Sequence, residues 1–449
     1  NITDADVDGV SGSLGHPDCD DSLPHVYPGA RELPGTGRDD TCNGEDVSAE
    51  TVRELWPTGV RAPTPSPEGE PQDWNVVFIT VDALRWDHLS MAGYERKTTP
   101  NLDMIARTCL VFEEAWAASN YPATSLYRLF TGLYPSAFLE GMEVIARPGI
   151  ELGAQLARAG YNTEAIVDIH PVPRHLLEGF KRTDTSLGIR ASAAVRNRSS
   201  GSTAKELTQL GFQALKRLGE SDKPFFLWMH YSEPHAEYLP HQGFDFGVED
   251  IDLYDSEVAF ADAWIGRLLA GLQDQGRFED TLIVITSDHG EAFGEHGTRT
   301  HGQSLYEEEL HVPLLIHVPG VKGKRVKSPV DLTDVLPSVL DALGRKPRFP
   351  THGETLLPHA INGTPLRTPE AFSEARLSYA RLQALRVGDE KVILDHLLGT
   401  VERYDLKADP EERDPDRDQN HGVEMGAWTD LHLSWPHTAM QSSESLPGK

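Results

Sequence analysis

The stretch "NVVFITVD" (75–82) decides the fold class, because it is an almost unbroken run of β-branched and aromatic residues that ends on a carboxylate. Similar runs occur further along the chain: "NTEAIVDI" (162–169), "PFFLWMHY" (224–231), "TLIVITSD" (281–288) and "VPLLIHV" (312–318). Helix-like segments such as "SEVAFADAWIGRLLAGLQDQG" (256–276) lie between them. Near-continuous apolar strands that alternate with amphipathic helices predict an α/β fold with a mostly parallel, doubly wound sheet.

Changes in composition predict the domain organisation. We expect an Asp/Cys-rich segment (1–50), a Pro-rich linker (51–73), an α/β domain (74–364), a small β subdomain (365–418) and a polar tail (419–449). The linker contains "RAPTPSPEGEPQDW", which is typical of an extended spacer. The β subdomain contains "RLQALRVGDEKVILDHLLGTVERYDL", whose Gly-Asp and Leu-Gly-Thr turns predict a small antiparallel sheet.

The net charge of −29 over 449 residues argues against nucleic acid as a partner. Phosphate backbones need neutralisation by Lys and Arg, which an acidic chain does not supply. The chain also contains no run of about 18 apolar residues, so we expect no transmembrane segment.

The N-terminal segment carries a pattern typical of calcium binding. In "DADVDGVSG", alternate carboxylates precede a turn glycine, and "HPDCDDSLPHVYPGARE" supplies more of them. The expected calcium ligands are Asp4, Asp6, Asp8, Asp18, Asp20 and Asp21. Gly15 stands where an EF-hand loop would end on Glu, so this is not an EF-hand. A disordered acidic leader is the alternative.

The cysteines indicate the compartment. Cys19 and Cys42 bracket an Asp/Gly/Pro-rich segment that has little to bury, which predicts a disulfide and an extracytoplasmic setting. Cys109 lies in the apolar stretch "ARTCLVFEEA" and is expected to be a buried small hydrophobe. The N-terminal Asp/Cys-rich segment (1–50) resembles calcium-binding repeats of secreted bacterial proteins. This resemblance implies a periplasmic, cell-surface or secreted bacterial protein.

Chemistry-bearing side chains stand at the ends of the predicted strands. Asp82 is the last residue of "NVVFITVD", and Asp288 is the last residue of "TLIVITSD", with His289 directly after it. His235 follows "PFFLWMHY" by four residues. In parallel sheets, ligands bind beyond the carboxyl ends of the strands. Carboxylates with an imidazole at one edge predict a site for a divalent metal: Ca²⁺, Mg²⁺, Mn²⁺ or Zn²⁺. Gly290 allows the backbone to turn so that its neighbours face one point.

These motifs together resemble the sulfatase family of the alkaline-phosphatase superfamily, from about Trp74 to Asp414. The matching segments are "NVVFITVDALRWDHLSMAGYERKTTPNLD", "KPFFLWMHYSEPHAEY", "YDSEVAFADAWIGRLL", "TLIVITSDHGEAFGEHG", "HGQSLYEEELHVPLLI" and "RYDLKADPEERDP". The resemblance implies a metal-dependent ester hydrolase with Asp82, Asp288 and His289 as metal ligands. It further implies that His230, His235 and His301 contact the anionic group of the substrate.

The chain departs from the family pattern in two places. Asp82 is followed by Ala83 where many sulfatases have a second Asp. In "ASNYPATSLYRLFTGLYPS" (118–136), the position of the family's nucleophile falls on Pro122, and no C/S-x-P-x-R motif is present. Formylglycine chemistry is therefore not expected. Thr124 and Ser125 are the candidate nucleophiles; they could instead cap the following helix, or a metal-bound water could attack.

Three functions remain open at this point. The first is hydrolysis of sulfate or phosphate esters of a small molecule, glycan or lipid. The second is binding of an anion or glycan by a catalytically inactive protein of this fold, which the proline at the nucleophile position favours. The third is transfer of a phosphorylated headgroup, which would use the same residues.

Overall fold

The computed structural model describes residues 71–134, 149–168, 173–187, 203–367, 370–376 and 381–417, with the backbone of 139–140 and 143–144. The chain divides into two compact units. One is Thr64–Leu366, and the other combines Asn1–Pro63 with Arg367–Lys449. The linker and tail expected from the sequence lie almost entirely outside the described residues.

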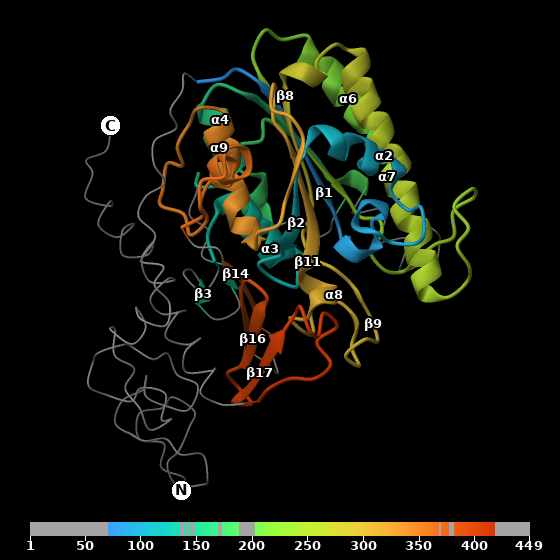
Figure 1. Cartoon of the computed structure of the whole chain (residues 1–449). Coiled ribbons are helices and arrows are strands. Elements are labelled where there is room, and N and C mark those ends of the chain that lie inside the picture. Colours follow the sequence, from blue (N-terminus) through green and yellow to red (C-terminus); the bar gives the residue numbers. More distant parts are fainter. Residues whose placement is uncertain are drawn as a thin grey trace, which may run out of the picture. The chain divides into compact units, whose positions relative to one another are not determined.

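A nine-stranded sheet forms the centre of the first unit (Figure 1). Its main path runs in the order β12-β2-β11-β8-β1-β7-β5-β6, and β13 pairs with β2. The strands are β1 (Asn75–Val81), β2 (Leu110–Trp116), β5 (Asn162–Val167), β6 (Arg182–Asp184), β7 (Phe225–Tyr231), β8 (Thr281–Ser287), β11 (His311–His317), β12 (Lys324–Val326) and β13 (Val330–Asp331). β11 pairs antiparallel with β8 and β2, whereas the other pairs in this sheet are parallel.

Helices cover both faces of this sheet. Figure 1 shows α2, α6 and α7 on one face and α3, α4 and α9 on the other. The helices are α2 (Pro100–Ile105), α3 (Pro122–Thr131), α4 (Leu152–Arg158), α6 (Ala204–Gly219), α7 (Asp250–Asp274), α8 (Glu307–Leu310), α9 (Val335–Ala342) and α10 (Leu357–Asn362). Short 3-10 turns lie at Trp86–His88, Ser90–Ala92, Ala106–Thr108, Arg174–Leu177, Phe278–Asp280 and Leu332–Asp334. No helix in the described ranges has the length and apolar composition needed to cross a bilayer.

The predicted α/β fold is confirmed, with differences in detail. The five predicted apolar runs form β1, β5, β7, β8 and β11. All residues of β1, β7 and β8 are buried, which explains why these strands show no polar alternation. β2 was not predicted, because its "LVFEEAW" combines apolar residues with two glutamates. The antiparallel direction of β11 was not predicted either, because periodicity does not encode strand direction.

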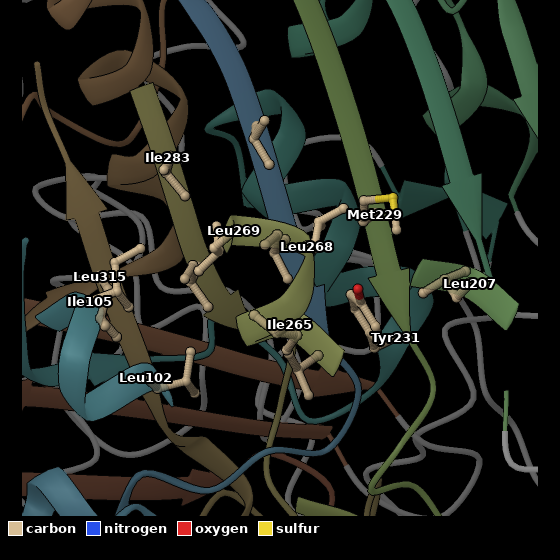
Figure 2. Close-up of a cluster of buried hydrophobic side chains, with 14 of the residues drawn as sticks. Leu102, Ile105, Leu207, Met229, Tyr231, Ile265, Leu268, Leu269, Ile283 and Leu315 are labelled. Carbon is tan, nitrogen blue, oxygen red and sulfur yellow. The ribbon is translucent and has the colours of Figure 1, made fainter. Parts of the chain in front are cut away.

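The main core lies between α7 and the sheet. Figure 2 shows Ile265, Leu268 and Leu269 of α7 facing Met229 of β7 and Ile283 of β8. Burial of one such large aliphatic side chain stabilises a fold by about 1.5–3 kcal/mol. Most of the predicted helix 256–276 lies in α7, which begins earlier, at Asp250, and ends at Asp274. The starting point is set by a capping box between Glu249 and Asp252.

Cys109 belongs to this core, as expected. It is a free thiol, is almost fully buried, and precedes β2 directly. Burial raises the pKa of its thiol to about 12. The thiol is therefore protonated at neutral pH and packs as a small apolar group.

The second unit contains a four-stranded antiparallel sheet in the order β14-β15-β16-β17. Its strands are β14 (Glu370–Arg376), β15 (Arg381–Val387), β16 (Glu390–Asp395) and β17 (Thr400–Asp405). The turn between β15 and β16 contains Gly388 at φ 61°, as the Gly-Asp sequence predicts. Lys391 and Glu412 form a fully buried ion pair with 2.6 Å between Nζ and Oε1.

The segment after β1 is anchored to α7 through Asp255. This fully buried carboxylate accepts hydrogen bonds from His88 Nδ1 (2.7 Å), Tyr94 Oη (2.7 Å) and Arg96 Nη1 (2.6 Å). On the same helix, Asp262 accepts from the backbone N–H groups of Asn101 and Leu102, in the first turn of α2. These contacts explain why motif residues such as His88 and Arg96 are present although they lie away from the strand ends.

Asp255→Ala is expected to destabilise the first unit by about 3–5 kcal/mol, because it removes one partner from a buried charged network. The measurement is urea unfolding followed by tryptophan fluorescence. The control is Asp274→Ala, which removes an exposed aspartate at the end of the same helix. Equal stability of the two variants would contradict the anchoring role of Asp255.

Candidate metal and anion site

Adjacent parallel strands bring the predicted strand-end residues together. In the registers of β1 with β7 and β8, Val81 lies beside Tyr231 and Ser287. Asp82 and Asp288 are the next residues of their strands, so they leave the sheet side by side. The site therefore lies at the carboxyl edge of the sheet, where ligands of α/β proteins bind.

Asp82, Asp288 and His289 form one buried cluster. Their possible ligand atoms all lie within 4.8 Å of one another. His289 Nε2 is 3.3 Å from Asp82 Oδ1 and 3.8 Å from Asp288 Oδ2. These same three atoms are buried and have no hydrogen-bond partner within the described part of the chain. Buried polar atoms without partners are costly, and a divalent cation between them would satisfy all three.

The hydrogen bonds around the cluster prepare it for a cation. His289 Nδ1 lies 2.8 Å from the Gly290 carbonyl oxygen. A carbonyl only accepts, so Nδ1 carries the proton and Nε2 presents its lone pair to the carboxylates when the ring is neutral. The other oxygen of Asp288, Oδ1, accepts from the His289 backbone N–H at 3.1 Å. Such outer contacts fix the direction of metal ligands.

The pKa shifts of Asp288 and His289 show that the buried cluster has too little positive charge for its two carboxylates. Burial and the neighbouring Asp82 raise the pKa of Asp288. Burial opposes a charged imidazole at His289, yet Asp288 and Asp82 together raise its pKa to about 10. Without a cation, the cluster therefore holds a proton on His289. A divalent metal would displace that proton, which couples metal affinity to pH.

Three further histidines surround the cluster. His230 is fully buried in β7, with Nδ1 2.7 Å from Thr80 Oγ1 and Nε2 3.7 Å from Asp82 Oδ2. The centroid of the His301 ring lies 4.2 Å from the ring centroid of His289 and 4.9 Å from that of His235. The structure thus brings together all the histidines that were predicted for anion contact.

The hydroxyl candidates lie on α3, and one of them contacts the cluster. Ser125 is fully buried, and its Oγ donates to the Asp288 carbonyl oxygen at 2.5 Å. Thr124 is half-buried; its Oγ1 donates to the Tyr121 carbonyl oxygen (3.0 Å) and lies 2.9 Å from Ser119 Oγ. The alternative that Thr124 or Ser125 caps the helix is wrong. The helix begins at Pro122, and the cap residue is Tyr121, whose side chain makes no capping bond.

Several residues of the site were not predicted from the sequence. Asn120 is fully buried and donates from Nδ2 to the Ser304 carbonyl oxygen at 2.7 Å, while its Oδ1 has no partner among the described residues. Ala83 adopts φ 60°, a left-handed conformation that Asn and Asp tolerate better than Ala does. Glu291 and Glu309 bond to His301 and its loop. Glu291 lies inside "SDHGEAFGEHG" and Glu309 inside "HGQSLYEEELHVPLLI", and these two family-like segments were the only signal for them.

Arg85 has a different role from an anion contact. It is buried and pairs with Asp87 and with Glu295, and its Nη1 donates to the Glu291 carbonyl oxygen at 2.8 Å. It therefore connects the segment after β1 to the loop after β8. The proposed calcium ligands Asp4, Asp6, Asp8, Asp18, Asp20 and Asp21, together with Cys19 and Cys42, lie outside the described residues.

Comparison with known proteins identifies the family. The sulfatase family model matches residues 74–345. A family model for a metal-binding motif of the copper-binding MopE type matches residues 18–46, inside the Asp/Cys-rich segment. The choline-sulfatase of Rhizobium meliloti is 32% identical over 417 residues, covering 75% of this chain and 81% of that protein. An arylsulfatase of Clostridium perfringens is 24% identical over 364 residues, covering 60% and 74% respectively.

A solved structure shares the fold. The phosphonate monoester hydrolase of Agrobacterium radiobacter superposes with a TM-score of 0.63 at 21% identity, covering 81% of this chain and 96% of that chain. At this identity, the likeness shows the fold alone. The sulfatase model, however, spans more than half of the sequence and includes the strand-end cluster. The chain therefore belongs to the sulfatase family of the alkaline-phosphatase superfamily and is a hydrolase of that family.

Proposed function

We propose that this chain is a metal-dependent hydrolase of sulfate or phosphate esters of small molecules, glycans or lipids. One observation carries the proposal: the atoms Asp82 Oδ1, Asp288 Oδ2 and His289 Nε2 are buried, adjacent and without a hydrogen-bond partner among the described residues. An inactive anion-binding protein is the alternative, and turnover of an ester substrate distinguishes the two. Ca²⁺, Mg²⁺, Mn²⁺ and Zn²⁺ are all compatible with two carboxylates and one imidazole.

The residues divide the catalytic work. A bound divalent cation supplies Lewis-acid stabilisation of the charge on the transferring group. His301, whose ring adjoins that of His289, and His235, whose ring adjoins that of His301, donate hydrogen bonds from Nε2 to its oxygens when their rings carry a second proton. Donors fixed in a buried site stabilise developing charge strongly because they need no reorganisation during the reaction.

For the nucleophile, we propose Thr124 rather than Ser125. The Ser125 hydroxyl is fully buried and committed to the backbone of a proposed metal ligand, whereas Thr124 is half-buried with only local partners. A phosphorylated threonine can be hydrolysed by water, while a sulfated one is hard to turn over. Attack by Thr124 therefore favours phosphate esters. The structural likeness to a phosphonate monoester hydrolase and the sequence likeness to choline-sulfatase support testing both ester classes.

For the N-terminal segment, we propose calcium binding by Asp4, Asp6, Asp8, Asp18, Asp20 and Asp21, and a Cys19–Cys42 disulfide. The metal-binding motif that matches 18–46 supports the binding of a metal there. A disulfide persists in oxidising compartments, which supports an extracytoplasmic location in a bacterium.

Asp82→Asn and His289→Ala are each expected to remove one metal ion per chain and to lower kcat/KM by about 10³-fold, which is about 4 kcal/mol. Metal content by mass spectrometry and turnover of aryl sulfate, phosphate monoester and phosphodiester substrates test this. His296→Ala is the matched control, because His296 pairs with Glu308 instead of the cluster. Unchanged metal content in both cluster variants would refute the site.

Thr124→Ala is expected to abolish turnover without lowering the thermal midpoint by more than a few degrees. Ser125→Ala should retain turnover but lose about 1 kcal/mol of stability with its buried hydrogen bond. A phosphorylated Thr124 peptide after rapid acid quench would identify the nucleophile directly. Full activity in the double variant would exclude both hydroxyls and leave direct attack by water.

Calcium is expected to protect residues 1–50 from proteolysis, and a reductant should weaken this protection by opening Cys19–Cys42. Limited trypsin digestion with peptide mapping measures both effects. Asp6→Asn combined with Asp8→Asn should remove the calcium effect. Cleavage that does not respond to calcium would contradict the proposed ligands.

A further inference from the structure

The loop that carries His301 is held by a buried glutamate, Glu309. Its Oε2 accepts from the backbone N–H groups of Gly302 (2.7 Å) and Gln303 (3.2 Å). Its Oε1 accepts from the backbone N–H (2.9 Å) and the hydroxyl (2.6 Å) of Ser304. A single carboxylate thus fixes three consecutive residues after His301. This degree of fixation is unusual for a loop and indicates that the position of His301 matters.

The backbone of Thr300, directly before His301, also indicates that the position of this histidine is held by the structure. Thr300 has φ 65°, in the left-handed region that β-branched residues rarely occupy. Such a conformation costs of order 1–3 kcal/mol and persists where the surrounding structure imposes it. The chain therefore accepts local strain immediately before this histidine.

A second buried glutamate, Glu291, bonds directly to the ring. His301 Nδ1 lies 3.0 Å from Glu291 Oε1, and Glu291 is 0% exposed. A carboxylate only accepts, so Nδ1 carries the proton in this pair. Nε2 is then the ring nitrogen that remains for a substrate.

The backbone of Glu291 is itself immobilised. Its N–H donates to the Glu308 carbonyl oxygen at 2.8 Å, and its carbonyl accepts from Arg85 Nη1 at 2.8 Å. Glu291 lies three residues after Asp288 in the same loop. The distance between the cluster and His301 is therefore set by a short, rigid piece of backbone and one hydrogen bond.

We propose that Glu291 is a positioning residue of the active site. It holds His301 through Nδ1 in one orientation and, in the neutral ring, in one tautomer, so that Nε2 is the nitrogen that accepts a proton and, once protonated, donates to the anionic group of the substrate. Its kinetic consequences rest on the proposed hydrolase function, whereas the tautomer does not. A carboxylate that orients a functional imidazole in this way commonly contributes a factor of about 10–100.

The chain contains a matched control for this pair. Glu308 Oε1 lies 2.7 Å from Nδ1 of His296, and both residues are largely buried. The ring of His296 stacks on Tyr306 with centroids 3.7 Å apart, whereas the ring of His301 lies against the ring of His289. Glu308→Ala thus removes an equivalent glutamate–histidine hydrogen bond from a histidine with different ring neighbours.

The kinetic test compares Glu291→Ala, Glu291→Gln, His301→Ala and the double alanine variant. We expect Glu291→Ala to lower kcat about 10–100-fold with little change in KM, and Glu291→Gln to recover most of it by keeping an acceptor for Nδ1. In the His301→Ala background, Glu291→Ala should cost less than about twofold more, because the two residues act as a unit. Independent, multiplicative losses, or an equal loss in Glu308→Ala, would overturn the proposal.

The tautomer is tested without turnover. We expect ¹⁵N-histidine NMR of the full-length, metal-containing protein to show His301 protonated at Nδ1 in the wild type and in Glu291→Gln. Glu291→Ala should shift the signal towards the Nε2-protonated form, and His301→Ala assigns it. An unchanged tautomer in Glu291→Ala would overturn the positioning role. Absence of ester turnover by the wild type would refute the hydrolase function alone, since the NMR result still decides the tautomer.

Discussion

The mutual burial of two carboxylates at the ends of β1 and β8 is the constraint on which the site depends. Asp82 and Asp288 leave adjacent parallel strands at the same level, and burial keeps water from screening them. Like charges at this distance need a positive partner. The two carboxylates therefore raise the pKa of the neighbouring His289. The residues around Asp82 and Asp288 therefore serve to supply a positive charge or to hold its ligands in place.

Much of the family motif outside the cluster maintains geometry. Asp255 joins α7 to the segment after β1, and Arg85 joins that segment to the loop after β8. Ser125 attaches α3 to the backbone of Asp288. Each contact bridges elements that are distant in sequence, so the ligands are held to one another through the whole first unit. A side chain in a motif is therefore as often a fixing contact as a reacting group.

The two glutamates near His301 illustrate the same division. Glu309 fixes the loop, and Glu291 fixes the ring. Together with the conformation of Thr300, they show that some stability is given up to place one imidazole beside the cluster. Hydrogen bonds in a buried site are strong, and each is costly to leave unmade, so such a network also resists displacement of the histidine.

The sequence by itself determined the strands and the residues at their ends, because apolar runs must be buried and the chain order places one particular residue directly after each run. "NVVFITVD" and "TLIVITSD" thereby predicted both the fold class and Asp82, Asp288 and His289 as neighbours. Only the tertiary structure decided the antiparallel direction of β11, the use of the Ser125 hydroxyl and the pairing of Glu291 with His301. These depend on contacts between segments far apart in the chain or on loop geometry, and neither leaves a periodic pattern in the sequence.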